Sequence, residues 1–498
     1  MIDLELKKQL DEQQGEIIKD THKYLCVSAC PGAGKTYTLV NKVNQELKTL
    51  SDFQGIIACS FTKESSKEIK ERLRKINNNI DNCYIDTIDS FIMNLIIKPF
   101  LNRYLFEKKI IDKRIEIKST IIDNDKNLNL YTRLYDKKIE VRNDAIEYTK
   151  KWFERLKQGI YNISFPTYLL AESIVKMKLF NQLFSIRFPT IYIDEAQDLN
   201  YFQHRLLKAL KENTNINIIL FGDPNQSIYQ FRGARPELFN CLTQEDYYLK
   251  RITLSVRCHP SILFYANRIF DNSVTRTFDV SNVHLINKLD LALLECLKDK
   301  IFILVETNDK AIELYEQYKD DFDILYSKKL DKMPNDYNLN QHILDELIKY
   351  YLNYDNVNDR YKYPVEDLMN FLRTVSDKAK DKDFKIKNRT FKDFMMDSIN
   401  ILNIDVSEET INTIEQKLMD EKYKYFYYIV EKNNKIMTIH SSKGLENENV
   451  IIYLSNTYKI DEIFKNKLFV AITRAKSNVY IYCEGLPVIK KYITDLLN

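Results

Sequence analysis

Short runs of apolar residues recur along this 498-residue chain, and each is followed by a stretch with helical periodicity. This pattern is typical of parallel strands that helices cover on both faces. Two sets of such runs are present. The first set is 25–28, 56–60, 190–193 and 216–221, and the second is 301–305, 436–439, 450–454 and 479–483. We therefore predict an α/β protein with two parallel sheets.

Two long polar stretches, 93–184 and 308–432, interrupt these sets. Neither contains a buried-type apolar strand pattern, so we predict two mainly helical insertions. The two α/β domains are then discontinuous in sequence, the first comprising 1–92 and 185–250 and the second 251–307 and 433–498.

The second insertion contains a basic run with interleaved phenylalanines between Lys378 and Lys392. Such a run could bind a nucleic-acid backbone and stack on bases. Acidic residues at 377, 381 and 383 dilute its charge, which favours a solvated helix face. The aromatic cluster at 423–428 is expected in a core or a domain interface.

Composition indicates a globular protein, with 44% hydrophobic and 29% charged residues. The formal net charge is +3, so any nucleic-acid surface must be a local patch. No apolar run approaches the ~20 residues that span a bilayer, and the N-terminus lacks a signal-peptide pattern. The cysteines have neither disulfide-like pairing nor zinc-ligand spacing with histidines. We predict a cytoplasmic protein with no membrane segment and no metal beyond nucleotide-bound Mg²⁺.

The first apolar run leads into a glycine loop that ends Gly-Lys-Thr at 34–36. Glycines at 32 and 34 let backbone N–H groups approach a triphosphate, Lys35 can reach its β- and γ-phosphates, and Thr36 can bind Mg²⁺. The helix that starts here points its positive end at the same anion. We predict a site for ATP and Mg²⁺ formed by Ala29, Cys30, Pro31, Gly32, Ala33, Gly34, Lys35, Thr36 and Thr38.

A second polar signal, Asp-Glu-Ala-Gln-Asp at 194–198, directly follows the apolar run 190–193. Ligands of open α/β sheets bind at the carboxyl ends of strands. Asp194 is expected to hold Mg²⁺, and Glu195 to orient and deprotonate the water that attacks the γ-phosphate. The alternative is a cluster that caps the helix beginning near Tyr201.

A third strand is followed by the segment GDPNQSIYQFRGA at 222–234. With this segment and the DEAQD run, the chain resembles the superfamily 1 helicases of the UvrD/Rep/PcrA type. The resemblance covers about half of the chain and neither insertion. Its other segments, in the family's order, are 60–62 with Glu68 and Arg72, 86–91, 254–257 with 266–267, 438–446 and 470–476.

The resemblance implies two RecA-like, P-loop motor domains and roles for single residues. Gln226 would sense the γ-phosphate, and Gln14 would read the adenine. Arg257 and Arg474, placed on the second domain, would act as arginine fingers across a cleft that closes during hydrolysis.

On the second domain, Glu446 would contact the nucleotide ribose, and Gly444 would leave room for it. Two departures from the family pattern concern the nucleotide. Cys30 and Pro31 replace the usual Gly-Ala, and Pro31 offers no N–H. Val256 stands where a tyrosine usually stacks on the adenine, which predicts relaxed base selectivity.

The family also implies a set of DNA contacts. Aromatic residues would stack on bases without reading sequence, and polar residues would contact the phosphate backbone. Without the resemblance, core packing is the expected role of the aromatic ones. The stacking set is Phe61, Tyr229 and Phe231, and the backbone set is Thr62, Thr87 and His440.

Together these features predict an ATP-dependent helicase that moves along single-stranded DNA and opens tailed duplexes, in DNA repair or anti-phage defence. The 3′→5′ direction is implied by the family alone. An alternative is a DNA-activated ATPase that serves as the sensor subunit of a nuclease. Chains of this size resemble the helicase-like subunit of the Gabija anti-phage system, which works with an OLD-like nuclease. The intact polar residues named above argue against a third possibility, a nucleotide-binding protein without activity.

Overall fold

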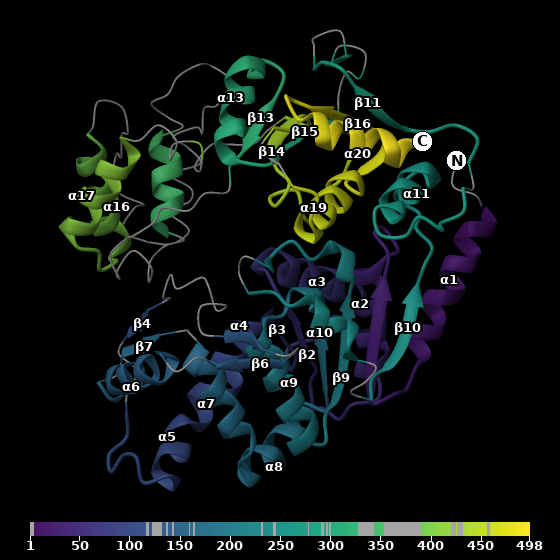
Figure 1. Ribbon diagram of the computed structural model, residues 1–498. Helices are drawn as coiled ribbons and strands as arrows, with labels where there is room; N and C mark the ends of the chain where they lie inside the picture. The colour runs from purple at the N-terminus through teal and green to yellow at the C-terminus, as the bar shows by residue number, and fades with distance from the viewer. Residues whose placement is uncertain are drawn as a thin grey trace. The chain divides into compact units, whose positions relative to one another are not determined.

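The computed structural model contains two six-stranded parallel sheets, each flanked by helices (Figure 1). Contacts divide the chain into a first unit, Met1–Leu263 with Asp461–Thr473, and a second unit, Phe264–Ile460 with Arg474–Asn498. The α/β prediction is therefore confirmed. The structure describes residues 4–115, 119–121, 132–135, 138–141, 144–158, 160–162, 165–230, 233–242, 246–276, 278–289, 293–294, 297, 300–326, 343–352, 390–419, 425, 432–455 and 459–498.

The first sheet has the strand order β10-β1-β9-β8-β2-β3. Its central strands are apolar and buried, because helices cover both faces. Alternate side chains of β8 reach opposite faces: Ile191 and Ile193 join one core and Tyr192 joins the other. The strands are β1 (Tyr24–Ala29), β2 (Ile57–Ser60), β3 (Tyr84–Thr87), β8 (Thr190–Ile193), β9 (Asn217–Gly222) and β10 (Tyr248–Ile252).

Different segments of the chain cover the two faces of this sheet. One core joins the sheet to α1 (Leu4–Lys19), α2 (Lys35–Leu47) and α3 (Lys63–Ile76). The other face receives helices from 88–107, from the stretch between 144 and 187, and from the segment that follows β8. These are α4 (Ile88–Phe91), a π-helix (Ile92–Ile97), α5 (Lys98–Glu107), α6 (Asp144–Lys157), α7 (Phe165–Val175), α8 (Lys178–Arg187) and α9 (Tyr201–Asn213).

The first insertion also contains four short strands that the sequence did not predict. They form a parallel pair and an antiparallel pair. Three or four residues are too few for an alternating pattern to stand out in a polar stretch. The pairs are β4 (Ser119–Ile121) with β7 (Ile160–Asn162), and β5 (Thr132–Tyr135) with β6 (Lys138–Val141).

The second sheet has the order β11-β16-β15-β12-β14-β13. Its central strand β12 is buried along its whole length, and α13 (Asn308–Tyr318) packs on one face. The strands are β11 (Val283–Ile286), β12 (Ile301–Val305), β13 (Asp323–Leu325), β14 (Lys435–Thr438), β15 (Asn447–Leu454) and β16 (Ala475–Cys483). The remaining helices are α10 (Pro236–Asn240), α11 (Pro260–Arg268), α16 (Phe391–Leu402), α17 (Glu408–Leu418), α19 (Glu462–Ile472) and α20 (Pro487–Leu497).

Two expected domain boundaries need correction. β10 pairs with β1 through Ile252, so the first sheet extends beyond residue 250. β13, at Asp323–Leu325, pairs with β14, so this strand of the second sheet lies inside the stretch 308–432 that was predicted as the second insertion. The two strands escaped prediction for different reasons: β10 is largely exposed and lacks the continuous apolar pattern of a central strand, whereas β13 is buried but only three residues long.

The predicted second insertion contributes a separate small core, formed by α16, α17 and the helical residues 343–352. Most of the basic run lies outside the described residues; Lys392, at its end, pairs with Glu408. From the aromatic cluster at 423–428, Tyr425 is described, and it packs against Tyr315 and Tyr326 as a core aromatic.

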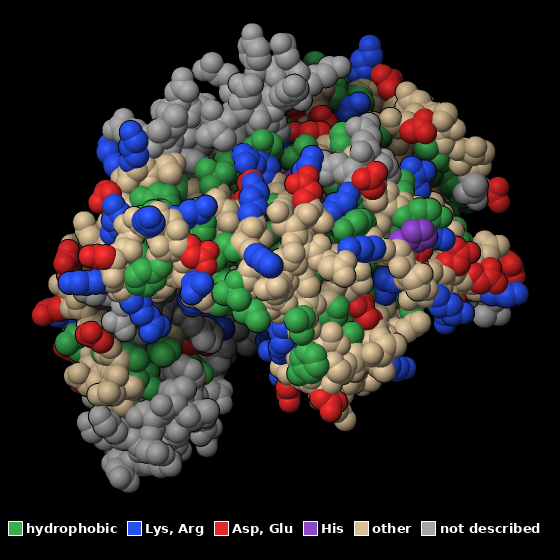
Figure 2. All heavy atoms as spheres, turned by 90° about the horizontal axis from the view of Figure 1, so that it is seen from below, with side chains coloured by type: hydrophobic (Ala, Val, Ile, Leu, Met, Phe, Trp, Pro, Cys, Tyr) green, Lys and Arg blue, Asp and Glu red, His purple; other side chains and the backbone are tan. Residues whose placement is uncertain are grey.

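Charged side chains of both signs are interspersed on the face seen in Figure 2. This agrees with the small net charge of +3. Within the part of the chain that the structure describes, every helix is too short or too polar to cross a lipid bilayer.

Replacing Phe180 tests the packing of α8 against the first sheet. Phe180 is 0% exposed and stacks on Phe184 at 4.6 Å between ring centroids. Phe180→Ala should lower the free energy of unfolding by about 3–5 kcal/mol, because it leaves a cavity in the core. Leu183→Ala, on the same helix but 53% exposed, is the matched control and should change stability by less than about 0.5 kcal/mol. Equal losses in urea denaturation would contradict this packing.

Candidate active site

Three polar segments meet at one edge of the first sheet. β1, β9 and β8 are neighbours in the sheet and run in the same direction. The glycine loop follows β1, residues 194–198 follow β8, and residues 223–226 follow β9. Because the carboxyl ends of parallel strands lie at the same edge, segments far apart in sequence converge on one site.

The glycine loop has the backbone that a phosphate cradle requires. Gly32 and Gly34 have φ angles of 74° and 71°, in the left-handed region that favours glycine. A Cβ on Gly32 would lie 2.3 Å from Arg257 Cβ, and one on Gly34 would lie 2.6 Å from Gln14 Nε2. No side chain caps the start of α2, whose first N–H groups are suited to an anion.

Lys35 and two carboxylates form the centre of the site. The Nζ atom of Lys35 donates to Glu195 Oε1 and lies 3.4 Å from Asp194 Oδ1. Burial alone would lower the pKa of Lys35, but Asp194 and Glu195 outweigh it and raise the pKa. Burial raises the pKa of Asp194, and the ammonium of Lys35 partly opposes that shift. The pair is therefore held by mutual charge in a site largely screened from water.

Oxygen atoms suited to Mg²⁺ lie beside this ion pair. Thr36 Oγ1 is 3.5 Å from Asp194 Oδ2. A hydroxyl and a carboxylate are the hard ligands that Mg²⁺ prefers, usually completed by water and substrate phosphates. Among the described residues no cluster of three or more His, Cys, Asp or Glu could hold a metal by itself. Thr36 and Asp194 thus fit a metal that arrives with a phosphate ligand.

Glu195 is held in a strained backbone conformation. Its φ of 56° is unusual for a residue other than glycine, and its Oε2 accepts a hydrogen bond of 2.6 Å from Gln197 Nε2. Helix α9 is capped instead by Asn200 and Gln203 in a capping box. The alternative that the acidic run serves to cap this helix is therefore wrong, and both carboxylates face the site.

Gln197 and Asp223 connect the second and third segments. Gln197 Oε1 accepts from the backbone N–H of Asp223 at 3.0 Å, and Asp223 Oδ2 accepts from Gln226 Nε2 at 2.7 Å. Burial raises the pKa of Asp223 to about 6. A Cβ on Gly222 would lie 2.7 Å from Gln197 Oε1, so a larger residue at the strand end would displace this amide.

Sequence reasoning missed Gln197 and Asp223 as site residues. A usable signal was present, because both are polar and directly follow buried strands within segments already identified. Predicted roles were assigned to their neighbours Glu195 and Gln226, and the residues that hold those side chains were not considered.

Gln14 and Arg257 also lie at the glycine loop. Gln14 Nε2 donates to Ala33 O at 2.9 Å from a buried position. Arg257, expected on the second domain, instead belongs to the first unit, where its Cβ adjoins Gly32. This corrects its placement: the chain leaves β10 at Ile252 and passes directly over the loop.

The remaining predicted nucleotide residues lie together in the second unit. Arg474 is 2% exposed, and its Nη1 donates to Leu445 O at 3.3 Å. Glu446 pairs with Lys476 at 2.9 Å. Gly444 has a φ of 87°, and no atom lies within 4 Å of the position its Cβ would take.

The predicted DNA-contacting aromatics of the first unit pack on each other. Phe61 and Tyr229 stack with ring centroids 5.2 Å apart, and Tyr229 is buried. Thr62 and Thr87 cap α3 and α4 by accepting from Ser65 N and Ser90 N, and His440 follows β14 in the second unit. Phe231 lies outside the described residues.

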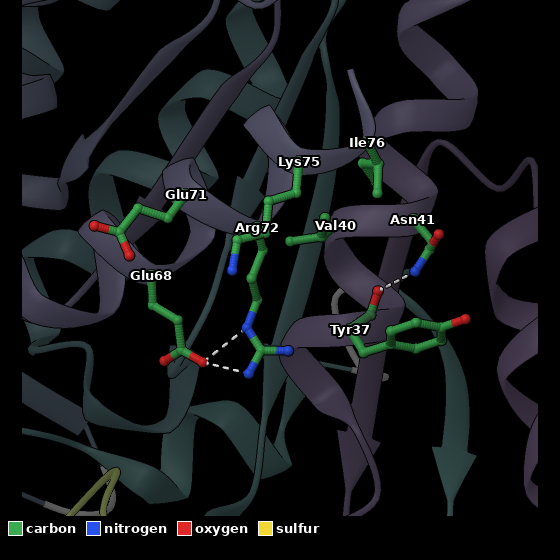
Figure 3. Close-up of a pocket in the computed structure, with 8 residues that line it drawn as sticks. All are labelled: Tyr37, Val40, Asn41, Glu68, Glu71, Arg72, Lys75 and Ile76. Carbon is green, nitrogen blue, oxygen red and sulfur yellow. Dashed lines mark hydrogen bonds and ion pairs between the residues drawn. The ribbon is translucent and has the colours of Figure 1, made fainter. Parts of the chain in front are cut away.

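A separate pocket of about 560 Å³ lies between α2 and α3 (Figure 3). Arg72 Nη2 pairs with Glu68 Oε1 at 2.7 Å, and Asn41 Nδ2 donates to Tyr37 O at 2.9 Å. The pocket contains no carboxylate or amide from the three converging segments. Its lining is Tyr37, Val40, Asn41, Glu68, Glu71, Arg72, Lys75 and Ile76.

Known protein families match both sheets of this chain. Residues 14–232 match the AAA domain, and residues 435–482 match the UvrD-like helicase C-terminal domain. The first match spans all three converging segments, up to Arg232. The second spans 438–446 and 470–476, which the sequence had likened to helicases.

Individual relatives differ in how much of their length is matched. The Gabija protein GajB of Bacillus cereus is 26% identical, over 96% of this chain and 95% of that protein. A probable DNA helicase II homolog of Mycoplasma genitalium is 28% identical, over 52% of this chain and 42% of that protein. The ATP-dependent DNA helicase PcrA of Staphylococcus aureus is 26% identical, over 54% of this chain and 41% of that protein. The chain thus spans less than half the length of these two helicases.

Replacing Asp223 tests the burial of its carboxyl group. Its pKa is raised from 3.8 to about 6, so the folded protein binds this proton more tightly than the unfolded chain. The resulting stability is full below pH 4 and is lost as the pH rises through 6, by about 3 kcal/mol. Asp223→Asn cannot titrate, so the wild-type-minus-variant difference in unfolding free energy should fall between pH 4 and 7. A flat difference in urea denaturation would contradict the raised pKa.

Proposed function

This chain belongs to the UvrD/Rep/PcrA-like DNA helicases, and we propose that it couples ATP hydrolysis to 3′→5′ movement along single-stranded DNA. One observation carries the proposal. Lys35 lies within an ion pair's distance of Asp194 and Glu195, at the start of a helix that no side chain caps. A partly buried cation, an anion-binding helix end and two carboxylates are groups suited to phosphoryl transfer.

Each central residue has a role that follows from its position. Lys35 neutralises charge on the terminal phosphates of ATP, which displace the carboxylates that it contacts now. Glu195, held by Gln197, accepts a proton from the attacking water. Thr36 and Asp194 would hold Mg²⁺, which would supply electrostatic stabilisation of the phosphate oxygens.

The outer nucleotide contacts come from both units. We assign Gln226 to the γ-phosphate, because Asp223 fixes its amide beside the carboxylates. Arg257 and Arg474 are proposed to neutralise the transferring phosphoryl group, a contribution typically of about 10³–10⁵ in rate. Gln14 is assigned to the base. Gly444 and Glu446 are assigned to the ribose.

We assign the motor domains to the two sheets, the first at 1–92 and 185–252 and the second at 264–325 and 433–498.

DNA contacts are proposed for both motors. Opening of the Phe61–Tyr229 stack would free two aromatic faces for bases. Phe231 is proposed as a third stacking residue, and Thr62, Thr87 and His440 as contacts of the phosphate backbone. We also propose a cytoplasmic location.

A second function is favoured by the relative that is matched along its whole length. Similarity to the Gabija protein covers 95% of that protein, whereas the helicase relatives are matched over less than half. We therefore propose, as the alternative, a DNA-activated ATPase that regulates an OLD-like nuclease partner in anti-phage defence and separates strands poorly by itself.

Two substitutions separate nucleotide binding from hydrolysis. Lys35→Ala should weaken ATP binding and abolish turnover, because it removes the phosphate-neutralising cation. Glu195→Gln should bind ATP normally but lower kcat by about 10²–10⁴, because an amide cannot accept the proton. Steady-state ATPase assays with single-stranded DNA and equilibrium binding of a labelled ATP analogue measure both. Normal turnover by Glu195→Gln would contradict its role as the base.

Strand separation distinguishes the two proposed functions. With ATP and Mg²⁺, a helicase of this direction should displace the labelled strand of a 3′-tailed duplex and leave a 5′-tailed control intact. DNA-stimulated hydrolysis without displacement would remove the helicase proposal. Recovery of a nuclease bound to the chain purified from its native host would then support the regulatory alternative.

A further inference from the structure

Helix α19 joins the chemistry of the first unit to the strands of the second sheet. It lies in the chain between β15 and β16, which are adjacent strands of the second sheet. Its contacts nevertheless place Asp461–Thr473 in the first unit. Because the chain connects them directly, a displacement of β15 and β16 would be transmitted to α19, which packs in the first unit.

One buried amide fixes α19 to the third site segment. Asn466 is 3% exposed, and its Nδ2 donates to Ser227 O at 3.0 Å. Ser227 directly follows Gln226, and its backbone N–H closes the short helix Pro224–Gln226 by donating to Pro224 O. Its Oγ donates to Gln197 O at 3.3 Å. The amide of Asn466 therefore holds the carbonyl group of Ser227, a residue that directly follows Gln226 and whose hydroxyl contacts the backbone of Gln197.

A second contact holds the other end of α19. Cys258 Sγ donates to Thr473 O at 3.7 Å. Thr473 directly precedes Arg474, and Cys258 directly follows Arg257. The helix is thus attached at one point next to Gln226 and at another next to Arg257 and Arg474. A shift of α19 would therefore change the positions of these three residues.

We propose that Asn466 is a positioning residue for ATP hydrolysis, which ties the Gln226 segment to α19 and so makes turnover depend on the second sheet. The proposal rests on the ATPase function proposed above. A buried polar side chain needs a hydrogen-bond partner. The partner of Asn466 is the backbone carbonyl of Ser227, next to Gln226, and not a carbonyl of its own helix. Without the amide donor, that buried carbonyl loses a hydrogen bond and the segment can shift.

Substitutions of Asn466 test this role in the full-length protein with single-stranded DNA and ATP. Asn466→Ala removes the donor, and Asn466→Asp keeps the shape but presents oxygens that cannot donate at neutral pH. Both should lower kcat at least tenfold and change the KM for ATP less than about threefold, because the contact acts on turnover rather than on binding. Ile463→Ala, on the same helix and 45% exposed, is the control and should match the wild type.

A double-mutant cycle separates positioning from general stability. If Asn466 acts through Gln226, adding Asn466→Ala to Gln226→Ala should lower kcat by less than about twofold further. If the two substitutions instead lower kcat by independent factors that multiply in the double mutant, the proposal is overturned. A wild-type kcat in either folded Asn466 variant would also overturn it. Both Asn466 variants should unfold cooperatively near the wild-type melting temperature. If neither does, Asn466 serves stability alone, and the proposal is overturned. A wild-type protein without ATPase activity would instead refute the proposed function.

Discussion

The site depends on a partly buried ion cluster built from distant parts of the chain. Lys35 and Glu195 are 160 positions apart, yet they form an ion pair because β1, β9 and β8 are neighbours in one sheet. Removing charges from water is costly unless they are paired. The cluster therefore requires the sheet order to be right, and it leaves the lysine where a competing anion, such as a phosphate, can replace its partners.

Hydrogen bonds hold the side chains around this cluster in place. Gln197 contacts both Glu195 and the backbone of Asp223, and Asp223 holds Gln226. Glycine at 222 makes room for that amide. The left-handed backbone of Glu195 is tolerated because the surrounding contacts determine it. In the proposed mechanism, hydrolysis therefore depends on these supporting residues as well as on the residues assigned to the phosphates.

The sequence predicted the parts of the fold that are strongly patterned. Buried strands such as β1 and β8 are strongly apolar, and the polar segments that follow them are where the sequence placed the predicted site residues Lys35, Asp194 and Glu195. The edge strands gave no such signal, because β10 is largely exposed and β13 has only three residues, so both strands extend past the expected domain boundaries. Motifs also could not show that Arg257 adjoins Gly32 or that Phe61 stacks on Tyr229, because these contacts depend on the path of loops.

The most direct test of the ion cluster is an experimental structure with Mg²⁺ and a non-hydrolysable ATP analogue. It should place a terminal phosphate oxygen within hydrogen-bonding distance of Lys35 Nζ, with Mg²⁺ at Thr36 and Asp194 and with Glu195 released from the lysine. A triphosphate bound elsewhere, with the Lys35–Glu195 pair still intact, would contradict the account.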